Sequence, residues 1–66
     1  MEVTINGARR EVEACATLAE LVRALGLEGK RIAVERNGAI VPRSAYAATA
    51  IAADDRLEIV AAVGGG

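Results

Sequence analysis

The sequence predicts an α+β roll, in which a mixed sheet of about five strands packs on one main helix. Three observations predict this class: Asn-Gly dipeptides separate short alternating apolar runs, one amphipathic segment carries a helix-capping motif, and several short strand-like runs follow it. The 66 residues fall below the roughly 100–200 expected per domain. We therefore expect residues 1–66 to form a single domain with a flexible glycine tail at residues 64–66.

The chain opens with a predicted β-hairpin. Val3 and Ile5 alternate with polar residues and share one face of a strand, which ends at Asn6-Gly7. This dipeptide is a strong signal for a two-residue type I′ turn, because both central positions of that turn need a positive φ. A second strand is expected from Arg9 to Glu13, with Val12 facing inward.

A single helix follows. Thr17 and Glu20 match a capping box, in which their side chains satisfy backbone donors at a helix start. Apolar residues then recur at helical spacing and form one stripe: Leu18, Leu21, Val22 and Leu25. Glu20 and Arg23 are expected to pair on the exposed face. Gly26 is expected to end the helix, because glycine readily adopts the left-handed conformation.

Three shorter strands are expected after the helix. The first runs from Arg31 to Glu35 and is followed by a second tight turn at Asn37-Gly38. Ile40-Val41 continues as a short strand. Pro42 has no N–H to donate, so this strand ends there or lies at a sheet edge. The last strand runs from Arg56 to about Ala62.

The segment before the last strand has no clear period. Residues 43–53 are rich in alanine, which suits a short helical turn or a loop equally, and we assign no regular element there. Asp54-Asp55 then turns the chain into the last strand. Because this strand follows a long connection, we expect it to lie at the centre of the sheet and to carry the glycine tail from a rigid position.

Composition excludes several classes of function. The chain has no His, Trp or Phe and one cysteine, so disulfide frameworks, multi-cysteine zinc sites, histidine-based catalysis and aromatic stacking platforms for single-stranded nucleic acid are not expected. A net charge of −1 favours neither nucleic acid nor membrane as a partner. No apolar run approaches the ~20 residues of a membrane span, and no signal sequence is evident. We expect a cytoplasmic protein.

Few side chains in the sequence are candidates for a catalytic role. Cys15 has no histidine to activate it and is interpreted as a small, partly buried apolar residue. Ser44 and Tyr46 also lack an activating base. The basic pairs Arg9-Arg10 and Lys30-Arg31 lie beside turns. We interpret both pairs as solvated surface charges, with docking of a partner as the alternative.

The remaining candidate is the tail Gly64-Gly65-Gly66. A terminal extension without function would account for it. Alternatively, an extended glycine triplet spans roughly 10 Å and can thread a channel that any side chain would block. The Gly66 carboxylate is itself unreactive, and conversion to an acyl-adenylate with ATP in a partner enzyme would make it electrophilic. Ordering the tail costs on the order of 1–2 kcal/mol per residue, so the folded body must supply docking energy.

Taken together and in order, these motifs cover the whole chain and resemble the ThiS family, the sulfur carriers of thiazole formation in thiamine biosynthesis. The resemblance implies the ubiquitin-like β-grasp fold. The matching pieces are Asn6-Gly7, Thr17 to Val22, Leu25 to Leu27, Val34 to Gly38, Ile40 to Ser44, Asp55 to Val60, and Ala62 to Gly66. Asp54-Asp55 departs from the glycine-containing turn that the family leads us to expect.

The resemblance implies a sulfur carrier rather than an enzyme. Gly66 would be adenylated by an E1-like adenylyltransferase of the ThiF type, which uses ATP and Mg, and converted to a thiocarboxylate with sulfur from a cysteine desulfurase. Gly64 and Gly65 would thread the partner's active site. Thiazole synthase, of the ThiG type, would then consume the sulfur. The carrier itself would hold no cofactor, no metal and no catalytic residue.

Two alternatives remain open at this point. A sulfur carrier of the molybdopterin synthase small-subunit type shares the fold and the tail, although the short chain and the segment from Asn37 to Ser44 favour the thiamine carrier. A non-reacting β-grasp interaction module would carry its glycines as a mere tail. An exchange of oxygen for sulfur at Gly66 separates a carrier from a passive module.

Overall fold

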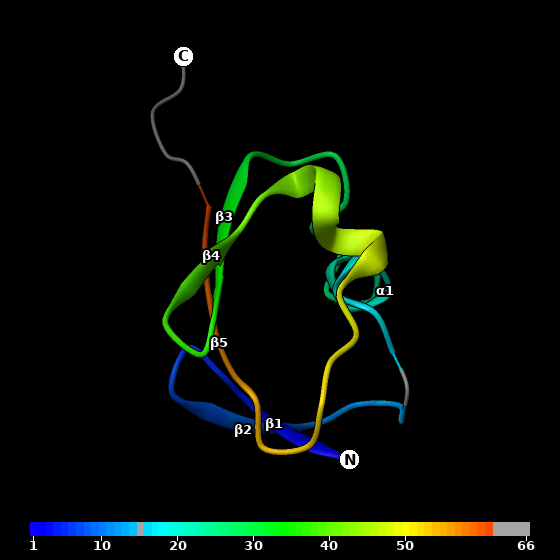
Figure 1. The fold of residues 1–66 in the computed structure, drawn as a ribbon, viewed down its shortest axis with the longest axis vertical. Coiled ribbons are helices and arrows are strands. Elements are labelled where there is room, and N and C mark those ends of the chain that lie inside the picture. Colours follow the sequence, from blue (N-terminus) through cyan, green and yellow to red (C-terminus); the bar gives the residue numbers. More distant parts are fainter. Residues whose placement is uncertain (15, 62–66) are drawn as a thin grey trace.

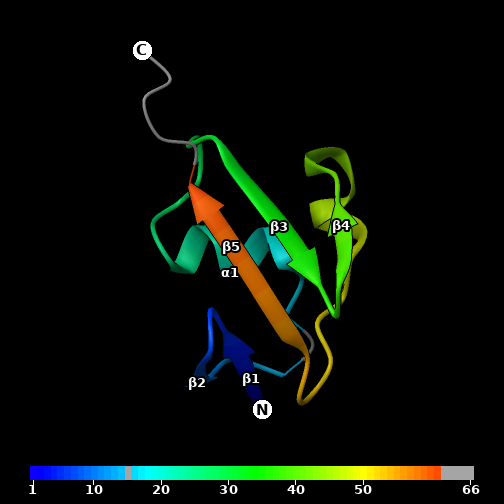
Figure 2. The same ribbon diagram turned by 90° about the vertical axis from the view of Figure 1, so that its left-hand side faces the viewer.

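The computed structural model describes residues 1–14 and 16–61, and within them seven short elements form the fold. These are β1 (Glu2–Ile5), β2 (Ala8–Glu11), α1 (Leu18–Ala24), β3 (Ile32–Arg36), β4 (Ala39–Val41), the 3-10 helix η1 (Arg43–Ala48) and β5 (Arg56–Ala61). The strands build one mixed five-stranded sheet in the order β2-β1-β5-β3-β4. Figure 2 shows α1 behind this sheet. The predicted α+β class, a mixed sheet on one main helix, is confirmed.

Both Asn-Gly turns adopt the predicted geometry. The φ values are 51° and 83° at Asn6 and Gly7, and 52° and 87° at Asn37 and Gly38. Two consecutive positive values are what a type I′ turn requires. Each turn joins an antiparallel pair, β1 with β2 and β3 with β4. The hairpin that opens the chain is therefore confirmed.

Strand ends differ from prediction by one or two residues. β2 stops at Glu11 rather than Glu13. Val12 follows the strand and still packs against the core, because its N–H donates to the Met1 carbonyl at 2.8 Å. β3 begins and ends one residue later than predicted. β4 lies at the sheet edge and stops before Pro42, as the missing proline N–H predicts.

The helix has the predicted capping box. The Glu20 N–H donates to Thr17 Oγ1 at 3.2 Å, and the Thr17 N–H donates to Glu20 Oε1 at 2.8 Å. Gly26, with φ of 74°, follows the C-cap residue. Glu20 and Arg23 are both exposed as predicted, but they do not form the predicted ion pair: Arg23 Nε donates to Glu28 Oε2 at 3.3 Å.

The core lies between the sheet and α1. It is mostly aliphatic, and its buried members in the described part of the chain are Val3, Ile5, Leu18, Leu21, Val22, Val34, Tyr46, Ile51, Leu57 and Ile59. Three residues of the predicted helix stripe are among them, and the fourth, Leu25, is half-buried. Burial of this face, rather than helix propensity, holds so short a helix in place.

The alanine-rich segment contains an element that the sequence does not predict. Residues 43–48 form η1, which lies against α1 (Figure 1). Tyr46 and Ile51 are the two large apolar residues of the region, and both are buried. The Leu18 N–H donates to the Thr49 carbonyl and the Ile51 N–H to the Ala16 carbonyl, each at 2.9 Å. Burial of two side chains, not a sequence period, fixes this segment.

Candidate functional site

The strand that precedes the glycines lies at the centre of the sheet. β5 pairs in parallel with β1 and antiparallel with β3, which confirms the predicted central position. Leu57 and Ile59 bury one face of the strand against the core. The last described pair joins Ala61 to Ile32. The end of β5 is therefore paired with β3 as far as Ala61, whereas its ladder with β1 ends at Leu57.

Asn6 continues the hydrogen bonding between β1 and β5 past the last residue of β1. Its N–H donates to the Leu57 carbonyl at 2.9 Å. Its side-chain Nδ2 donates to the Ile59 carbonyl at 2.9 Å, and its Oδ1 accepts from the Ile59 N–H at 2.7 Å. A carboxamide offers one donor and one acceptor, as a backbone peptide unit does. The Asn6 side chain therefore bonds to Ile59 as the backbone of a neighbouring strand residue would.

Asn37 holds the other end of β5 in the same way. Its N–H donates to the Arg56 carbonyl at 2.7 Å, and its Oδ1 accepts from the Arg56 N–H at 2.9 Å. Its Nδ2 donates to Asp55 Oδ1 at 3.0 Å. Each Asn-Gly turn thus closes a hairpin and, through its asparagine, fixes the strand that leads to the tail.

Asp55 is a buried carboxylate at the start of β5, with 6% of its surface exposed. Its Oδ2 accepts from Arg36 Nε at 2.7 Å and from the Ala52 N–H at 2.8 Å. Burial by itself raises the pKa of Asp55, but the hydrogen bonds from Arg36, Ala52 and Asn37 outweigh it, so the pKa lies below its usual value. The group is an anchor for three segments and is not poised to exchange protons.

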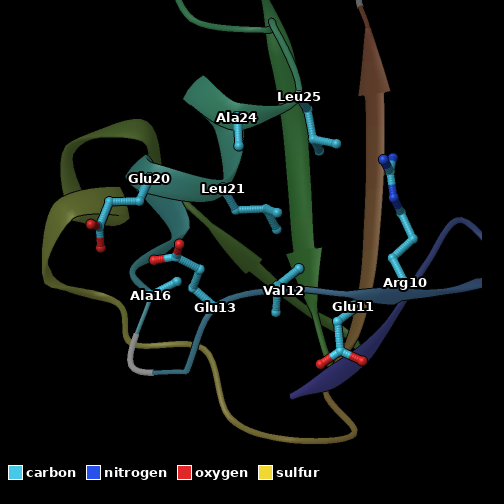
Figure 3. Close-up of a pocket in the computed structure, with 9 residues that line it drawn as sticks. All are labelled: Arg10, Glu11, Val12, Glu13, Ala16, Glu20, Leu21, Ala24 and Leu25. Carbon is cyan, nitrogen blue, oxygen red and sulfur yellow. The ribbon is translucent and has the colours of Figure 1, made fainter.

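A pocket of about 300 Å³ opens between the chain after β2 and α1. Figure 3 shows Val12, Leu21 and Leu25 at its apolar floor, with glutamates at the rim. Two of these are already engaged: Glu11 Oε2 accepts from the Met1 amino group at 2.8 Å, and Glu20 belongs to the capping box. The described lining of this pocket contains no Ser, Thr, Cys or Lys side chain.

Several residues singled out by the sequence lie outside the described part of the chain. These are Cys15 and the tail residues Gly64, Gly65 and Gly66. Tyr46 is described and is a core residue rather than a reactive one. Among residues 1–14 and 16–61, no group of three metal-ligating side chains can hold an ion. No helix in these ranges has the length and apolar character to cross a membrane.

The sequence analysis did not predict the hydrogen bonds from Asn6 and Asn37 to β5, or the hydrogen bonds that Asp55 accepts. Asparagine and aspartate both suit positive φ, so the turn pattern alone does not distinguish them. One signal was present: both turns carry asparagine, whose amide can donate as well as accept. Neither turn carries aspartate, which only accepts when ionised. That shared choice points to a hydrogen-bond partner beyond the turn.

Comparison with known proteins finds close matches in sequence and fold. The model of the ThiS family matches residues 3–66. The crystal structure of the thiamine biosynthesis protein ThiS from Geobacter metallireducens is 32% identical, with a TM-score of 0.85 and full coverage of both chains. An NMR structure of a thiamine biosynthesis protein from the same organism gives a TM-score of 0.81 at 32% identity, covering all of this chain and 88% of the other.

Two curated relatives are much longer proteins, and both are named thiazole synthase. The relative from Paramagnetospirillum magneticum is 47% identical and that from Magnetococcus marinus 41% identical, each over 66 residues. Each match covers 100% of this chain and 20% of the relative. The chain therefore spans about a fifth of the length of these relatives.

Proposed function

Because this chain belongs to the ThiS family, with its ubiquitin-like β-grasp fold, we propose that it carries sulfur for thiazole formation in thiamine biosynthesis as a thiocarboxylate on Gly66. One observation carries the proposal. The family match extends to residue 66 and so includes all three terminal glycines, the part of the chain on which the chemistry depends.

The chemistry begins with activation of the Gly66 carboxylate. In an E1-like adenylyltransferase of the ThiF type, a carboxylate oxygen attacks the α-phosphorus of ATP bound with Mg, and pyrophosphate leaves. The terminal sulfur of a persulfide, formed from cysteine by a cysteine desulfurase, then attacks the acyl carbon, and AMP leaves; a thiol reductant cleaves the resulting acyl disulfide and is itself oxidised to a disulfide. The product is a thiocarboxylate. The partners supply the catalysis and the bound nucleotide, and this chain supplies the acyl group.

The structure of β5 supports this division of labour. Hydrogen bonds from Asn6 and Asn37 fix the strand in the folded protein, so docking orders no residue of β5 anew. The ordering cost of roughly 1–2 kcal/mol per residue applies to the tail alone. A carrier whose last strand is already fixed therefore confines the entropy cost of presenting its terminus to the tail residues.

Thiazole synthase, of the ThiG type, is the proposed consumer of the sulfur. Relatives with that name contain a segment similar to this whole chain within a much longer polypeptide. Joining a carrier to its consumer keeps the two at high effective concentration. The likeness therefore favours thiazole formation over transfer to a molybdopterin precursor.

Intact-mass measurement tests the proposal. The purified chain is incubated with a ThiF-type adenylyltransferase, ATP, Mg, a cysteine desulfurase and cysteine. We expect the mass to rise by the difference between sulfur and oxygen, and fragmentation to place the change at Gly66. Subsequent incubation with thiazole synthase and its small substrates should restore the original mass.

Two controls make the test decisive. A chain that lacks Gly65 and Gly66 should stay unchanged, and omission of ATP should prevent any mass change in the parent. An unmodified parent would favour a passive interaction module, and a branched isopeptide on another protein would indicate conjugation. Sulfur that passes only to a molybdopterin precursor would contradict the assignment to thiamine.

A further inference from the structure

Three cationic residues gather where β5 reaches its last described residue. Arg31 immediately precedes Ile32, the partner of Ala61 in the sheet. Lys30 lies next to it in the chain, and Arg43 Nη2 donates to the Lys30 carbonyl at 2.7 Å. This contact holds the start of η1 against the start of β3. Residues 30–31 and Arg43, which are distant in sequence, thus place three positive charges near Ala61, the last described residue of β5.

These cations are not used in ion pairs within the described part of the chain. Elsewhere in the fold, Arg9 pairs with Glu2 and Asp54, Arg23 with Glu28, and Arg36 with Asp55. Setting the three cations apart leaves five basic against nine acidic residues. The rest of the chain is therefore net negative, while these three cations lie together near the end of β5; Arg10 and Arg56 also make no ion pair in the described residues, but they lie apart from this group.

The same residues line a hollow with an apolar floor. Arg31 and Arg43 border a depression of about 350 Å³ whose floor is Ile32, Ala33 and Val60. Val60 is 63% exposed and so presents apolar surface beside two guanidinium groups. A neighbouring depression of about 280 Å³ shares Ile32 and Arg43 and adds Lys30 together with Glu28, whose carboxylate pairs with Arg23.

We propose that this basic hollow, formed by Lys30, Arg31, Ile32, Ala33, Arg43 and Val60, docks an acidic segment at the mouth of the adenylyltransferase channel that receives the tail. The inference rests on the proposed function and adds the docking surface to it. The partner segment is expected to combine Asp or Glu with one apolar side chain. The guanidinium groups would bind the carboxylates, and Val60 would cover the apolar side chain.

Electrostatics favours the adenylating partner as the occupant. The Gly66 carboxylate must approach the triphosphate of ATP, and the two negative groups repel each other. Attraction between the basic hollow and an acidic rim opposes that repulsion during approach, and it acts over roughly 8–10 Å at physiological salt. Complementary charge of this kind steers encounter and fixes orientation. This orientation places the end of β5 over the channel before the tail enters the channel.

The test compares two charge reversals on the same face of the molecule. Arg31→Glu alters the hollow, whereas Arg56→Glu alters the far end of β5 and changes the net charge by the same amount. Pyrophosphate–ATP exchange catalysed by a ThiF-type adenylyltransferase is measured against carrier concentration. We expect Arg31→Glu to raise the half-saturating concentration about tenfold with kcat unchanged, and Arg56→Glu to raise it less than about twofold.

Salt and a milder variant extend the test. Raising the ionic strength to about 1 M, where the screening length falls to roughly 3 Å, should bring the parent and Arg31→Glu together. Arg31→Gln, which removes the charge without reversing it, should show a smaller shift in the same direction, and melting curves verify that each variant is folded.

The outcomes separate the two proposals. Equal effects of Arg31→Glu and Arg56→Glu, or an Arg31→Glu chain that saturates like the parent, would overturn the docking surface while leaving the carrier function intact. A defect seen only in the reaction with thiazole synthase would overturn it as well, because the hollow would then serve another partner. A parent chain that supports no exchange overturns the proposed function and this inference with it.

Discussion

Asp55 lies where three segments meet, and its carboxylate joins them. It accepts hydrogen bonds from Arg36 on β3, Asn37 in the turn that follows, and the Ala52 N–H in the chain before β5. A buried charge is costly unless it is paired and fully hydrogen-bonded. Here both oxygens have partners, so the group specifies one arrangement of the three segments.

The lowered pKa of Asp55 predicts acid sensitivity. The folded protein holds this carboxylate ionised at pH values where an unfolded aspartate, with a pKa of about 3.9, already takes up a proton. Its contribution to stability is therefore complete above about pH 5 and is lost as the pH falls below about 4, through the lower pKa of the folded state. Urea unfolding from pH 7 to pH 2.5 should show this loss in the parent.

Asp55→Asn provides the comparison. It should lower the free energy of unfolding at pH 7 by about 1–3 kcal/mol, because the Arg36 guanidinium and the Ala52 N–H lose a charged acceptor. It should also weaken the fall in stability below pH 4. Glu13→Gln, which removes an exposed carboxylate, serves as the control for net charge. An Asp55→Asn protein with the parent's full acid dependence would show that other groups cause it.

At the level of elements, β5 owes its position to residues in two turns. Asn6 and Ile59 are 53 positions apart in sequence, yet two hydrogen bonds join them. The parallel ladder between β1 and β5 contains only two residue pairs, Thr4 with Arg56 and Ile5 with Leu57. The side chain of Asn6 therefore continues a short ladder toward the root of the tail.

Asn6→Gly tests the two side-chain hydrogen bonds between Asn6 and Ile59. Glycine accepts the positive φ of the turn, so the hairpin should persist while both side-chain hydrogen bonds to Ile59 disappear. We expect a loss of about 1–3 kcal/mol, from two bonds of roughly 0.5–1.5 kcal/mol each, and faster hydrogen exchange at Ile59. Asp54→Gly is the matched control, because Asp54 also has a positive φ and its side chain makes only an exposed ion pair. Equal protection of the Ile59 amide from hydrogen exchange in both variants would contradict this role of the Asn6 side chain.

The packing of α1 yields a second prediction at this scale. Leu21 is buried between the helix and the sheet, with 4% of its surface exposed. Leu21→Ala should lower the free energy of unfolding by about 2–5 kcal/mol through lost burial and a residual cavity. Arg23→Ala, on the exposed face, removes only a surface ion pair and should cost about 0–1 kcal/mol. Thermal or urea unfolding of both variants measures the difference, and a Leu21→Ala curve matching the parent would contradict the core assignment.

At the scale of the whole molecule, the body that the structure describes and the terminal glycines Gly64–Gly66, here called the arm, have different tasks in the proposed function. In the described residues the body offers a hydrogen-bonded central strand and a basic hollow. The arm carries the group on which the proposed chemistry acts. Mutations in the two parts should therefore differ in kind, with body variants acting through stability or docking and tail variants acting through activation.

Gly65→Ala tests the arm. The substitution lies beyond β5, so the melting curve should match that of the parent. A channel shaped for glycine would collide with the added methyl, and pyrophosphate–ATP exchange should fall at least about tenfold. Near-normal exchange would contradict threading of the tail through the partner, even if the chain proves to be a sulfur carrier.

Much of the fold was predictable because its signals are local. A positive φ at Asn6 and Asn37, and a hydroxyl and a carboxylate three residues apart at Thr17 and Glu20, depend on interactions within a few residues. The element order limits how a small sheet can cover one helix, so the α+β class and the central last strand followed. The terminal glycines, read with these motifs, pointed to the family.

Contacts between distant segments decided the remainder. Residues 43–48 form a 3-10 helix because Tyr46 and Ile51 find a place in the core, and no period in an alanine-rich stretch encodes that place. The side-chain bonds of Asn6 to Ile59, and the gathering of Lys30, Arg31 and Arg43, exist only once the sheet has formed. The sequence by itself determined the turns, the helix start and the tail, since short-range sterics and hydrogen bonds specify them. The tertiary structure alone decided which surfaces surround the root of that tail, because burial and long-range pairing bring them together.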